Sequence, residues 1–505
     1  MPVHRAVRIS PTLTMPMTAL SRGLAAALFL PLLAGAQATP APVTLSVEEA
    51  VNLAVVNNPQ LRQSLNARRS AAAATRSAYG QLLPNVNSTA STSWREGRQQ
   101  VFNGVGFGAS ANTIGSSAGV NASLTYGLDV LLQPKSSRLT ERAVEAEADA
   151  ATQQLRTTVT QQYLIALQAQ ARALLQDTLQ ESARLTVDLA RARLAAGTAT
   201  VLDVQRAEVA LGQQRVQVVQ SRNTLAIEKL RLFENLGVAP PASDVSLTSS
   251  FAVAPIGTAL NDLVELARKG NPNVIARRDR EDAAAVNQRI ARAQYLPQLS
   301  LSAGYGGFTN SFTDNSFPVT QALASKQGAC YSRGNVLTIV GQPFDPSTCA
   351  GISLSAEEAA AARSTNSAFP LAFTRNPYNV SAQLSLPLFN GFQREQRVAE
   401  AAVARDNAKQ AVRQQELAAQ QAVRVAYLNL DAARQTVAIQ DENGALARQA
   451  LLLAETRYRV GQATFLDVAN ARADFSRAEN DRITAVYDFH RAFAALEQAV
   501  GRRLR

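Results

Sequence analysis

Two kinds of hydrophobic and polar pattern follow one another along this chain, in the same order in both halves. Alanine- and arginine-rich stretches at 47–79 and 260–295 predict helices. Apolar residues then alternate with small polar ones, at 86–94 and 122–126 in the first half and at 299–303 and 378–386 in the second. Alternation predicts strands, so each half should contain helices followed by a strand pair.

An Asn-Pro pair interrupts each of the first helical stretches, at Asn58-Pro59 and at Asn271-Pro272. Asparagine is a good helix N-cap, and proline suits the first helical turn because its missing N–H has no partner there. Each pair therefore predicts the start of a new helix. Gly270, just before the second pair, fits the end of the preceding short helix.

The longest helical stretches, 137–196 and 393–460, follow the strand pairs. At 1.5 Å rise per residue each reaches roughly 90–100 Å. Each is followed by a tight turn and a return helix, at 201–235 and 465–500. A globular domain does not need helices of this length, so we expect them side by side in a coiled coil or a helical barrel.

The chain is an internal duplication, and we divide it into a first repeat at 39–240 and a second at 241–505. The early parts match at an offset of 213 residues, as in Pro59 and Pro272. The later parts match at an offset of 264, as in Gly197 and Gly461. The first strand pair lies at about 85–130 and the second at about 298–390. The difference of 51 residues between the offsets indicates an insertion at 309–375, inside the second strand pair.

The turns between the long and return helices carry the most specific motif. They read Gly197-Thr-Ala-Thr-Val-Leu-Asp203 and Gly461-Gln-Ala-Thr-Phe-Leu-Asp467. Glycine permits the left-handed conformation that ends a helix. Thr200 and Thr464 are placed as N-caps, with each aspartate three residues later, where its carboxylate can bond back. Capping is one role of the aspartates and lining a constriction is another, and the two are compatible.

The first 38 residues predict a secretory signal. Three arginines precede an apolar run, Leu24–Ala36, that is too short to span a bilayer, and Ala36-Gln37-Ala38 supplies small residues at the cleavage spacing. An uncleaved N-terminal anchor is the alternative interpretation. Cys330 and Cys349 lie in the insertion, whose glycine, serine and asparagine content predicts a loop. An exported chain meets an oxidising compartment, so we expect a disulfide that closes this loop rather than two free thiols or a metal site.

Charge and chemistry exclude several function classes. The net charge is +11, but the arginines are dispersed along helices rather than gathered in a patch with aromatics, so we expect no nucleic-acid partner. The two histidines are His4 and His490, and His4 belongs to the expected signal. We find no phosphate-binding loop, metal-ligand cluster or Ser/His/Asp arrangement, and so expect no enzyme, cofactor or metal.

Four strands per chain cannot close a membrane barrel, which needs about eight, so the strands indicate several chains; three would supply 12. The doubled pattern, with Leu384-Ser-Leu-Pro-Leu-Phe-Asn-Gly391 and the Arg457–Val468 turn, resembles the TolC-like outer-membrane factor family over essentially the whole mature chain. The resemblance implies a mainly α protein with membrane β structure. Three copies would form a 12-stranded barrel among outer-membrane lipids, continuous with a long periplasmic α-helical barrel.

The same resemblance implies an exit channel for a tripartite efflux pump or a type I secretion system. Its partners would be a periplasmic adaptor and an inner-membrane transporter, and its substrates drugs, metal ions or secreted proteins. A periplasmic coiled-coil adaptor or structural protein is the alternative; it explains the helices but not the two matching strand pairs.

By resemblance, Tyr458 and Asp467 occupy gate positions, and Asp203 ties neighbouring helices. The chain departs from the family archetype at Ala463, where the archetype has arginine, and at Asn470, where it has a second aspartate. Our hypothesis is a gate that is less tightly locked and less blocked by cations. Candidate adaptor contacts, with simple turn packing as the alternative, are Gly197, Ala199, Thr200, Leu202, Gly461, Ala463, Thr464 and Leu466.

Overall fold

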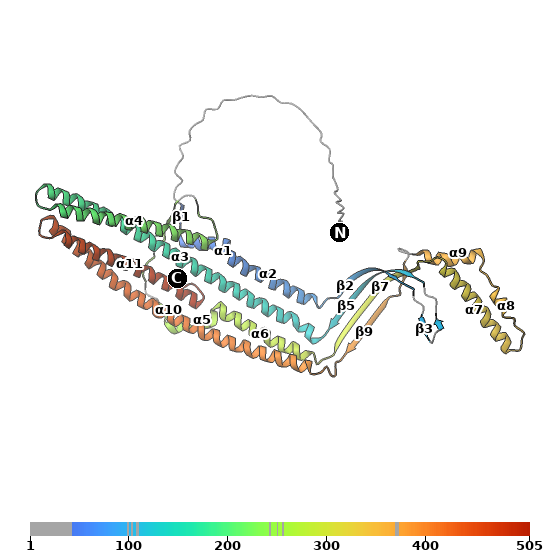
Figure 1. Cartoon of the computed structure of the whole chain (residues 1–505). Helices are drawn as coiled ribbons and strands as arrows, with labels where there is room; N and C mark the ends of the chain where they lie inside the picture. Colours follow the sequence, from blue (N-terminus) through green and yellow to red (C-terminus); the bar gives the residue numbers. More distant parts are fainter. Residues whose placement is uncertain are drawn as a thin grey trace, which may run out of the picture.

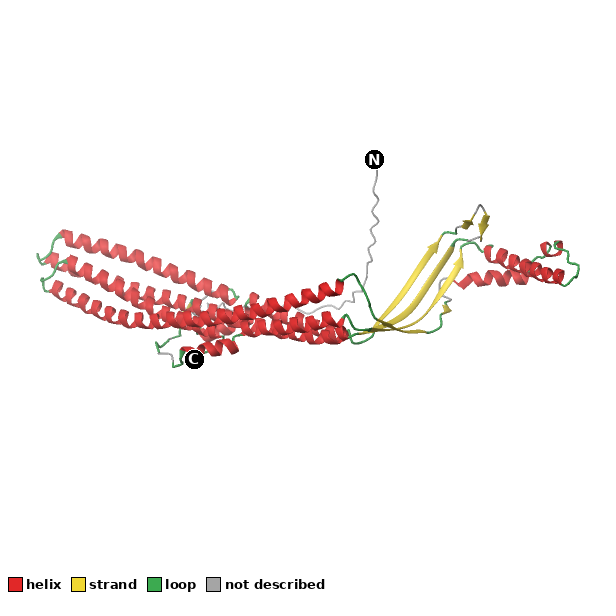
Figure 2. Ribbon diagram, turned by 90° about the horizontal axis from the view of Figure 1, so that it is seen from below, coloured by secondary structure: helices red, strands yellow, loops and turns green. Residues whose placement is uncertain are grey.

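The computed structural model describes residues 43–97, 100–102, 105–107, 111–241, 244–249, 251–254, 257–368 and 373–504. The molecule is elongated, with a body of long helices at one end, a small sheet in the middle and a helical hairpin at the other end (Figures 1 and 2). The secretory signal expected at residues 1–38 lies outside the described residues. Among the residues that are described, no helix is both long and apolar enough to cross a membrane.

Two very long helices run the length of the helical body. They are α3 (Leu128–Ala195) and α10 (Gln393–Arg459). Near the sheet, α2 (Pro59–Gly80) packs on α3 and α6 (Pro272–Ala293) lies between α3 and α10. At the far end, the return helices α4 (Val201–Leu236) and α11 (Phe465–Val500) pack on α3 and α10 respectively, and α11 also contacts α3 (Figure 1).

Helix α3 begins at Leu128 rather than at the expected 137, and it continues through Pro134. A proline inside a helix costs about 3 kcal/mol, which is why the sequence pattern places the start after it. In the structure Pro134 is buried, and Ser136 donates a hydrogen bond to Asn287 Oδ1 on α6 at 2.5 Å. Packing of α3 on α6 offsets the cost of the proline.

The sheet is an antiparallel meander in the order β2-β5-β7-β9. Its strands are β2 (Asn85–Arg95), β5 (Thr113–Tyr126), β7 (Gln298–Phe312) and β9 (Asn379–Ser385). The short β8 (Thr374–Arg375) adds to β7, and β3 (Gln100–Phe102) pairs with β4 (Val105–Phe107) apart from the sheet. In the described part of the chain, β2 and β9 each have one neighbour, so the sheet has two unpaired edges.

Strands β5 and β7 extend well beyond the alternating stretches that predicted them. The extensions are rich in glycine, which hides the alternation, and glycines meet across the pair at Gly119 and Gly306. A Cβ on Gly306 would lie 2.5 Å from the Ala118 carbonyl oxygen, so the close approach of the two strands requires glycine here. Strand β7 therefore continues into the first residues of the expected insertion, as far as Phe312.

The register gives the sheet one apolar and one polar face. Leu301 pairs with Leu124 on β5 and with Ala382 on β9, on the same face as Leu299 and Leu384. The side chains that face the other way are mostly serine, asparagine and glutamine, with glycines between them; they include Ser91, Asn121, Ser123, Ser300, Ser302, Gln383 and Ser381. Ser302 Oγ and Ser381 Oγ are 2.6 Å apart on the polar face. This confirms the alternation expected from the sequence.

The insertion folds into helices rather than the loop that its glycine, serine and asparagine content predicts. It consists of α7 (Phe317–Ile339), α8 (Ser347–Ala350), α9 (Ala356–Ser364) and the 3₁₀ turn η1 (Thr365–Ala368). A disulfide joins Cys330 of α7 to Cys349 of α8. Ser355 and Glu358 form a capping box that starts α9, a local signal that outweighs the composition.

The two repeats meet in a belt around the middle of the helical body. Strand β1 (Val43–Leu45) pairs in parallel with β6 (Val245–Leu247), and the Tyr163 hydroxyl donates to the Leu45 carbonyl at 2.7 Å. Helices α1 (Val47–Asn57) and α5 (Leu260–Gly270) pack on the two long helices. Separate apolar clusters surround Tyr163 in the first repeat and Phe489 in the second.

In each repeat the end of the return helix contacts the Asn-Pro pair that starts a new helix, and we call this contact the Asn-Pro joint. Asn58 caps α2, as the sequence predicted, and its Nδ2 donates to Asn235 O at 3.0 Å. Asn271 caps α6 and its Nδ2 donates to Ala499 O at 3.0 Å. Beside these contacts a glycine in the left-handed region ends each return helix, Gly237 with φ 73° and Gly501 with φ 87°.

We predict that Gly237→Ala destabilises the protein. An added Cβ would lie 2.9 Å from Asn57 O, and a left-handed backbone costs a residue with a side chain about 1–2 kcal/mol. The expected result is an apparent Tm lower by several degrees in a thermal scan of the detergent-solubilised protein. Gly80→Ala, at the exposed last residue of α2 with open space around it, is the matched control and should leave Tm unchanged or raise it. Equal changes of Tm in both variants would contradict the stabilising role that we give to the Asn-Pro joint.

Candidate functional site: the ends of the two helical hairpins

The hairpins α3–α4 and α10–α11 end in two turns that are built alike. Gly197 and Gly461 adopt left-handed conformations with φ of 73° and 81°, which ends the long helices as predicted. The next helix begins four residues later in both turns, at Val201 and at Phe465. Each turn is thus closed by local chemistry that the sequence already contains.

Reciprocal caps hold both turns, which confirms the capping role predicted for the two aspartates. Asp203 Oδ2 accepts from Thr200 N at 3.0 Å, and Thr200 Oγ1 accepts from Asp203 N at 3.2 Å. The second turn repeats this geometry, with Asp467 Oδ2 accepting from Thr464 N at 2.7 Å and Thr464 Oγ1 accepting from Asp467 N at 3.2 Å.

The caps also keep both aspartates charged. Hydrogen bonds from the backbone and hydroxyl of Thr464 lower the pKa of Asp467, and those of Thr200 do the same for Asp203. Arg206 and Arg193 lower the pKa of Asp203 further by their positive charge. Both hairpin ends therefore carry a carboxylate at neutral pH.

Arg193 joins the two hairpins near their ends. Its Nη1 donates to the Tyr458 carbonyl at 2.8 Å, and its guanidinium lies over the Tyr458 ring at 4.6 Å from the centroid. Its Nη2 donates to Thr198 O in the first turn at 3.2 Å. One side chain of α3 thus contacts its own turn and the end of α10, so Arg193 restrains the two hairpins relative to each other.

A second tie joins the two hairpins further from the turns, at Arg472 of α11. Its Nη2 donates to Ser182 Oγ at 3.0 Å and to Thr186 Oγ1 at 2.6 Å, both on α3. It also contacts Glu455 Oε1 on α10 at 3.4 Å. Burial lowers the pKa of Arg472, and Glu455 acts in the opposite direction. An arginine this buried depends on its partners, since an unpaired buried charge is costly.

The two repeats place an ion pair at equivalent positions with the charges exchanged. In the first hairpin, Arg191 pairs with Glu208 at 2.6 Å, and both side chains are largely exposed. The repeat offset of 264 residues carries these positions to Glu455 and Arg472. The exchange puts the arginine on α11, where it reaches α3, so the seam inside the chain gains a polar tie.

The residues predicted for a gate lie in different surroundings. Asp467 and Asn470 are exposed, and Asp203 is half-buried. Tyr458 is 4% exposed, inside an apolar cluster with Phe465, Val468 and Val187. Its hydroxyl has no hydrogen-bond partner among the described residues. The structure thus gives Tyr458 a packing role within the chain and leaves Asp467 and Asn470 free to face a lumen or a partner.

The turn residues predicted for partner contact form the outermost surface of the hairpins. Leu202 and Leu466 are 52% and 60% exposed. The glycines and threonines of the turns are exposed as well, while Ala199 and Ala463 are half-buried. Two exposed leucines at matching places give the end of the molecule a small apolar surface.

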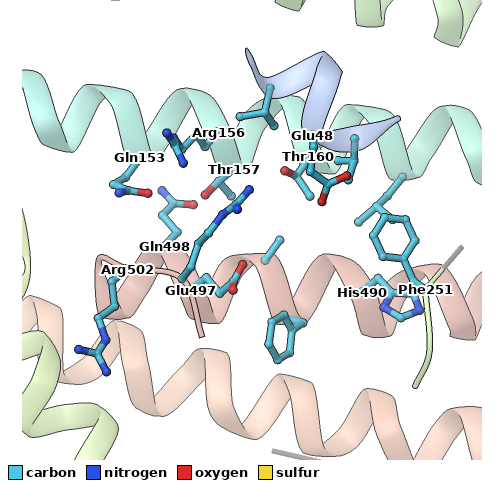
Figure 3. Close-up of a pocket in the computed structure, with 16 residues that line it drawn as sticks. Glu48, Gln153, Arg156, Thr157, Thr160, Phe251, His490, Glu497, Gln498 and Arg502 are labelled. Carbon is cyan, nitrogen blue, oxygen red and sulfur yellow. The ribbon is translucent and has the colours of Figure 1, made fainter. Parts of the chain in front are cut away.

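A separate cavity of about 270 Å³ lies between α1, α3 and α11 in the belt (Figure 3). Arg156, Glu48 and Glu497 line it, and His490 lies at one end between the rings of Phe251 and Phe489, each with its centroid 5.2 Å away. His490 is 4% exposed, as a packed core residue would be. In the described ranges no three His, Cys, Asp or Glu side chains are grouped to hold a metal ion.

Comparison with known proteins gives one consistent answer. The family model described as outer membrane efflux protein matches residues 50–238 and 351–502. The chain is 22% identical over 457 residues to outer membrane protein TolC of Vibrio cholerae, covering 90% of each. It is 30% identical over 265 residues to the fusaric acid resistance protein FusA of Burkholderia cepacia, a match that spans 51% of this chain and about half, 49%, of that relative.

Solved structures agree on the fold. The outer-membrane channel OprN superposes with a TM-score of 0.67 at 20% identity, covering 91% of this chain and 90% of that one. The open-state outer membrane channel MtrE of Neisseria gonorrhoeae superposes with a TM-score of 0.66 at 16% identity, covering 91% and 89%. The chain thus has the fold of these channels over nearly its whole length.

We predict that the hairpin ends stay ordered until strongly acidic pH. A carboxylate whose pKa is lowered by folding stabilises the fold above its unfolded pKa, here 3.8 for Asp467, and that contribution is lost as pH falls through the lower folded value. Hydrogen exchange at residues 461–470, corrected for intrinsic rates, should show constant protection from about pH 8 to about pH 5 and loss below about pH 4.

Thr464→Val is the control, because it removes the hydroxyl half of the cap but keeps the carboxylate. It should reduce protection at every pH. Loss of protection in the unaltered protein between pH 5 and 7 would contradict the assignment.

Proposed function

The chain belongs to the outer membrane efflux protein family, and we propose that three copies form the exit channel of a tripartite export machine. The family membership makes this an outer-membrane efflux channel with a periplasmic helical extension. What carries the proposal for three copies is the sheet, which is four strands wide because the short β8 and β9 share one side of β7, and which has two unpaired edges and two chemically different faces.

Edge pairing between copies supplies what one chain lacks. Unpaired backbone N–H and C=O groups cost several kcal/mol each in a bilayer, so membrane sheets close on themselves. Pairing β9 of one copy with β2 of the next closes a 12-stranded barrel with three copies. The apolar face, with Leu299, Leu301 and Leu384, then faces lipid, and the serine-rich face lines a wet lumen.

The helices offer a matching seam. On the β2 side of the molecule, α4 exposes Val209, Val216 and Val219 at 53% to 68%. On the β9 side, α10 exposes Leu446 and Leu453 at 57% and 52%. Exposed apolar side chains in rows at the two free sides fit a second copy of the same chain. We propose that α4 of one copy packs on α10 of the next and closes a helical tube.

The hairpin ends then form the periplasmic entrance of this tube. Asp467 lies exposed at the end of each second hairpin, so three copies place a ring of carboxylates there, and Asn470 adds a neutral ring nearby. We propose that this ring is the constriction. The ties through Arg193 and Arg472 hold the two hairpins of a chain together, and widening of the entrance requires that they separate.

The proposed partners are a periplasmic adaptor and an inner-membrane transporter. The adaptor would contact the two turns, at Gly197, Ala199, Thr200, Leu202, Gly461, Ala463, Thr464 and Leu466; the two exposed leucines provide the apolar contacts. The relative FusA is named for resistance to fusaric acid, which supports small toxic organic molecules as the substrate class. Secreted proteins of a type I system are the alternative.

We predict that Arg193→Ala makes the channel easier to open. The variant loses a cation–π contact and one hydrogen bond between the hairpins, both to Tyr458 and together worth roughly 1.5 kcal/mol, and a second hydrogen bond within the first turn. Open probability in planar lipid bilayers should rise about tenfold.

Arg459→Ala is the control for Arg193→Ala, because it removes an exposed arginine near the same turn. It should leave open probability unchanged. If the two variants behave alike, the Arg193 tie does not restrain the entrance.

We predict that Asn470→Asp strengthens block by divalent cations, and that Asp467→Asn weakens it. A second ring of carboxylates a few ångström from the first should bind a divalent cation roughly tenfold more tightly. Single-channel current measured against millimolar Mg²⁺ on the periplasmic side tests both changes.

Asn443→Asp is the control for added charge, since it lies exposed on α10 well away from the turn. It should not alter the block. Identical block in the unaltered protein and in Asn470→Asp would place the constriction elsewhere.

A further inference from the structure

The helical insertion between β7 and β9 is an addition to the second repeat, because the offset between the repeats rises by 51 residues across this segment. The family match stops at residue 238 and resumes at 351, a gap that holds α7 and α8 together with α5, α6 and β7. The hairpin stands at the end of the sheet away from the helical body (Figures 1 and 2). None of the roles proposed above for the channel uses this unit.

Several contacts give the hairpin a defined structure. The Cys330–Cys349 disulfide joins α7 to α8. Lys326 Nζ lies 2.8 Å from both carboxylate oxygens of Glu358, which ties α7 to α9. The Phe344 ring lies directly against Gly334, where any side chain would collide with it. These three contacts fix the position of the far end of the hairpin relative to the residues where the hairpin leaves the sheet.

The first turns of α7 lie beside the polar face of the sheet, while Thr309 and Ser311 on the other face of β7 are buried, at 3% and 4% exposed. A hollow of about 1000 Å³ is lined by the polar-face residues Ser93, Gly115, Ser117 and Asn310, and by Gln321 of α7. The ring of Phe312, also on this face, lies 4.7 Å from that of Phe317, the first residue of α7. The first turns of α7 therefore overhang the surface that lines the proposed lumen.

A buried asparagine fixes the return of the hairpin to the same strand. Asn366 Nδ2 donates to Phe312 O at 2.7 Å and to Asn315 Oδ1 at 2.6 Å, and Asn366 Oδ1 accepts from Phe312 N at 2.5 Å. Asn366 is 8% exposed. Both legs of the hairpin are thus anchored at the end of β7, at the rim of the proposed barrel.

The far end of the hairpin is apolar and exposed. Val336, Ile339 and Val340 are 59%, 83% and 65% exposed. Between 317 and 368 three cations, Lys326, Arg333 and Arg363, balance three anions, Asp345, Glu357 and Glu358. A neutral unit with an apolar end has no charge repulsion between copies, and no cluster of basic residues with which to hold anionic lipid headgroups.

The dimensions allow copies to meet. The 23 residues of α7 span about 35 Å at 1.5 Å per residue. Twelve strands spaced about 4.8 Å apart and tilted about 40° enclose a barrel about 25 Å across. A hairpin rooted on the lumen side of the rim is therefore long enough to reach its counterparts over the opening.

We propose that the three α7–α9 hairpins of the assembled channel meet over its outer mouth through Val336, Ile339 and Val340 and form a cap that narrows the exit. Each apolar tip contacts the same apolar tip of another copy of this chain. The inference rests on the proposed trimer, and it adds a second constriction at the opposite end from the carboxylate ring. The disulfide and the Asn366 anchor hold each tip in position for this contact.

The test uses the full-length protein carrying Ile339→Cys, reconstituted in liposomes and oxidised with copper phenanthroline without reductant, so that the native disulfide stays intact. The mass of the purified complex is measured first and should correspond to three chains. Cysteines held together at neighbouring tips should then link into two-chain products on a non-reducing gel, about tenfold more than in the control Ala360→Cys, an exposed position on α9.

Four results would overturn the cap. Equal linking at 339 and 360, or none at 339 in a complex of three chains, would show that the tips do not meet, and would leave the channel intact. Quenching by nitroxide-labelled lipid of a fluorophore attached to the Ile339→Cys variant at position 339 would show that the tip lies in the membrane instead. A mass other than three chains would overturn the proposed function and the cap together. As a functional readout, linking at 339 should reduce single-channel conductance, and reduction of the link should restore it.

Discussion

A sheet four strands wide, with one apolar face and two unpaired edges, cannot pair all its backbone groups or shield its apolar face within one chain. The backbone groups of β2 and β9 need partners, the leucine-rich face needs an apolar environment and the serine-rich face needs water. Closure of three copies into a ring meets all three needs at once. The rest of the molecule is consistent with that ring, since α4 and α10 expose apolar rows on the same two free sides.

In the helical body, the two hairpins of one chain meet at a seam that contains polar ties. Inside the chain, Arg193 and Arg472 cross from one hairpin to the other with hydrogen bonds to Tyr458, Ser182 and Thr186. Arg472 can do so because an ion pair present in both repeats has its charges exchanged in the second. The same seam buries an apolar cluster in which Val187 of the first hairpin meets Tyr458 and Phe465 of the second. Separation of the hairpins therefore breaks these polar ties and also exposes apolar surface, so both resist opening.

The sequence predicted the parts of this structure that depend on local chemistry. Helix starts at Asn58 and Asn271, and the capped turns at Thr200 and Thr464, follow from side chains that bond within a few residues. The Arg193 and Arg472 ties join residues more than 260 positions apart, and no local pattern contains them. A comparison of charges at the repeat offset of 264 would have revealed the exchanged pair, but not its contacts with α3. The helices of the insertion were missed because composition outweighed the capping box at Ser355. The gate and adaptor roles of the turn residues stay predictions.

The most direct test of the proposed ring is electron cryo-microscopy of the protein in lipid nanodiscs, reconstructed without imposed symmetry. We expect three chains around one axis, with β9 of each beside β2 of the next within the bilayer and the serine-rich face toward the axis. A single chain, a different number of chains, or a sheet whose leucine-rich face lines the opening would contradict the ring.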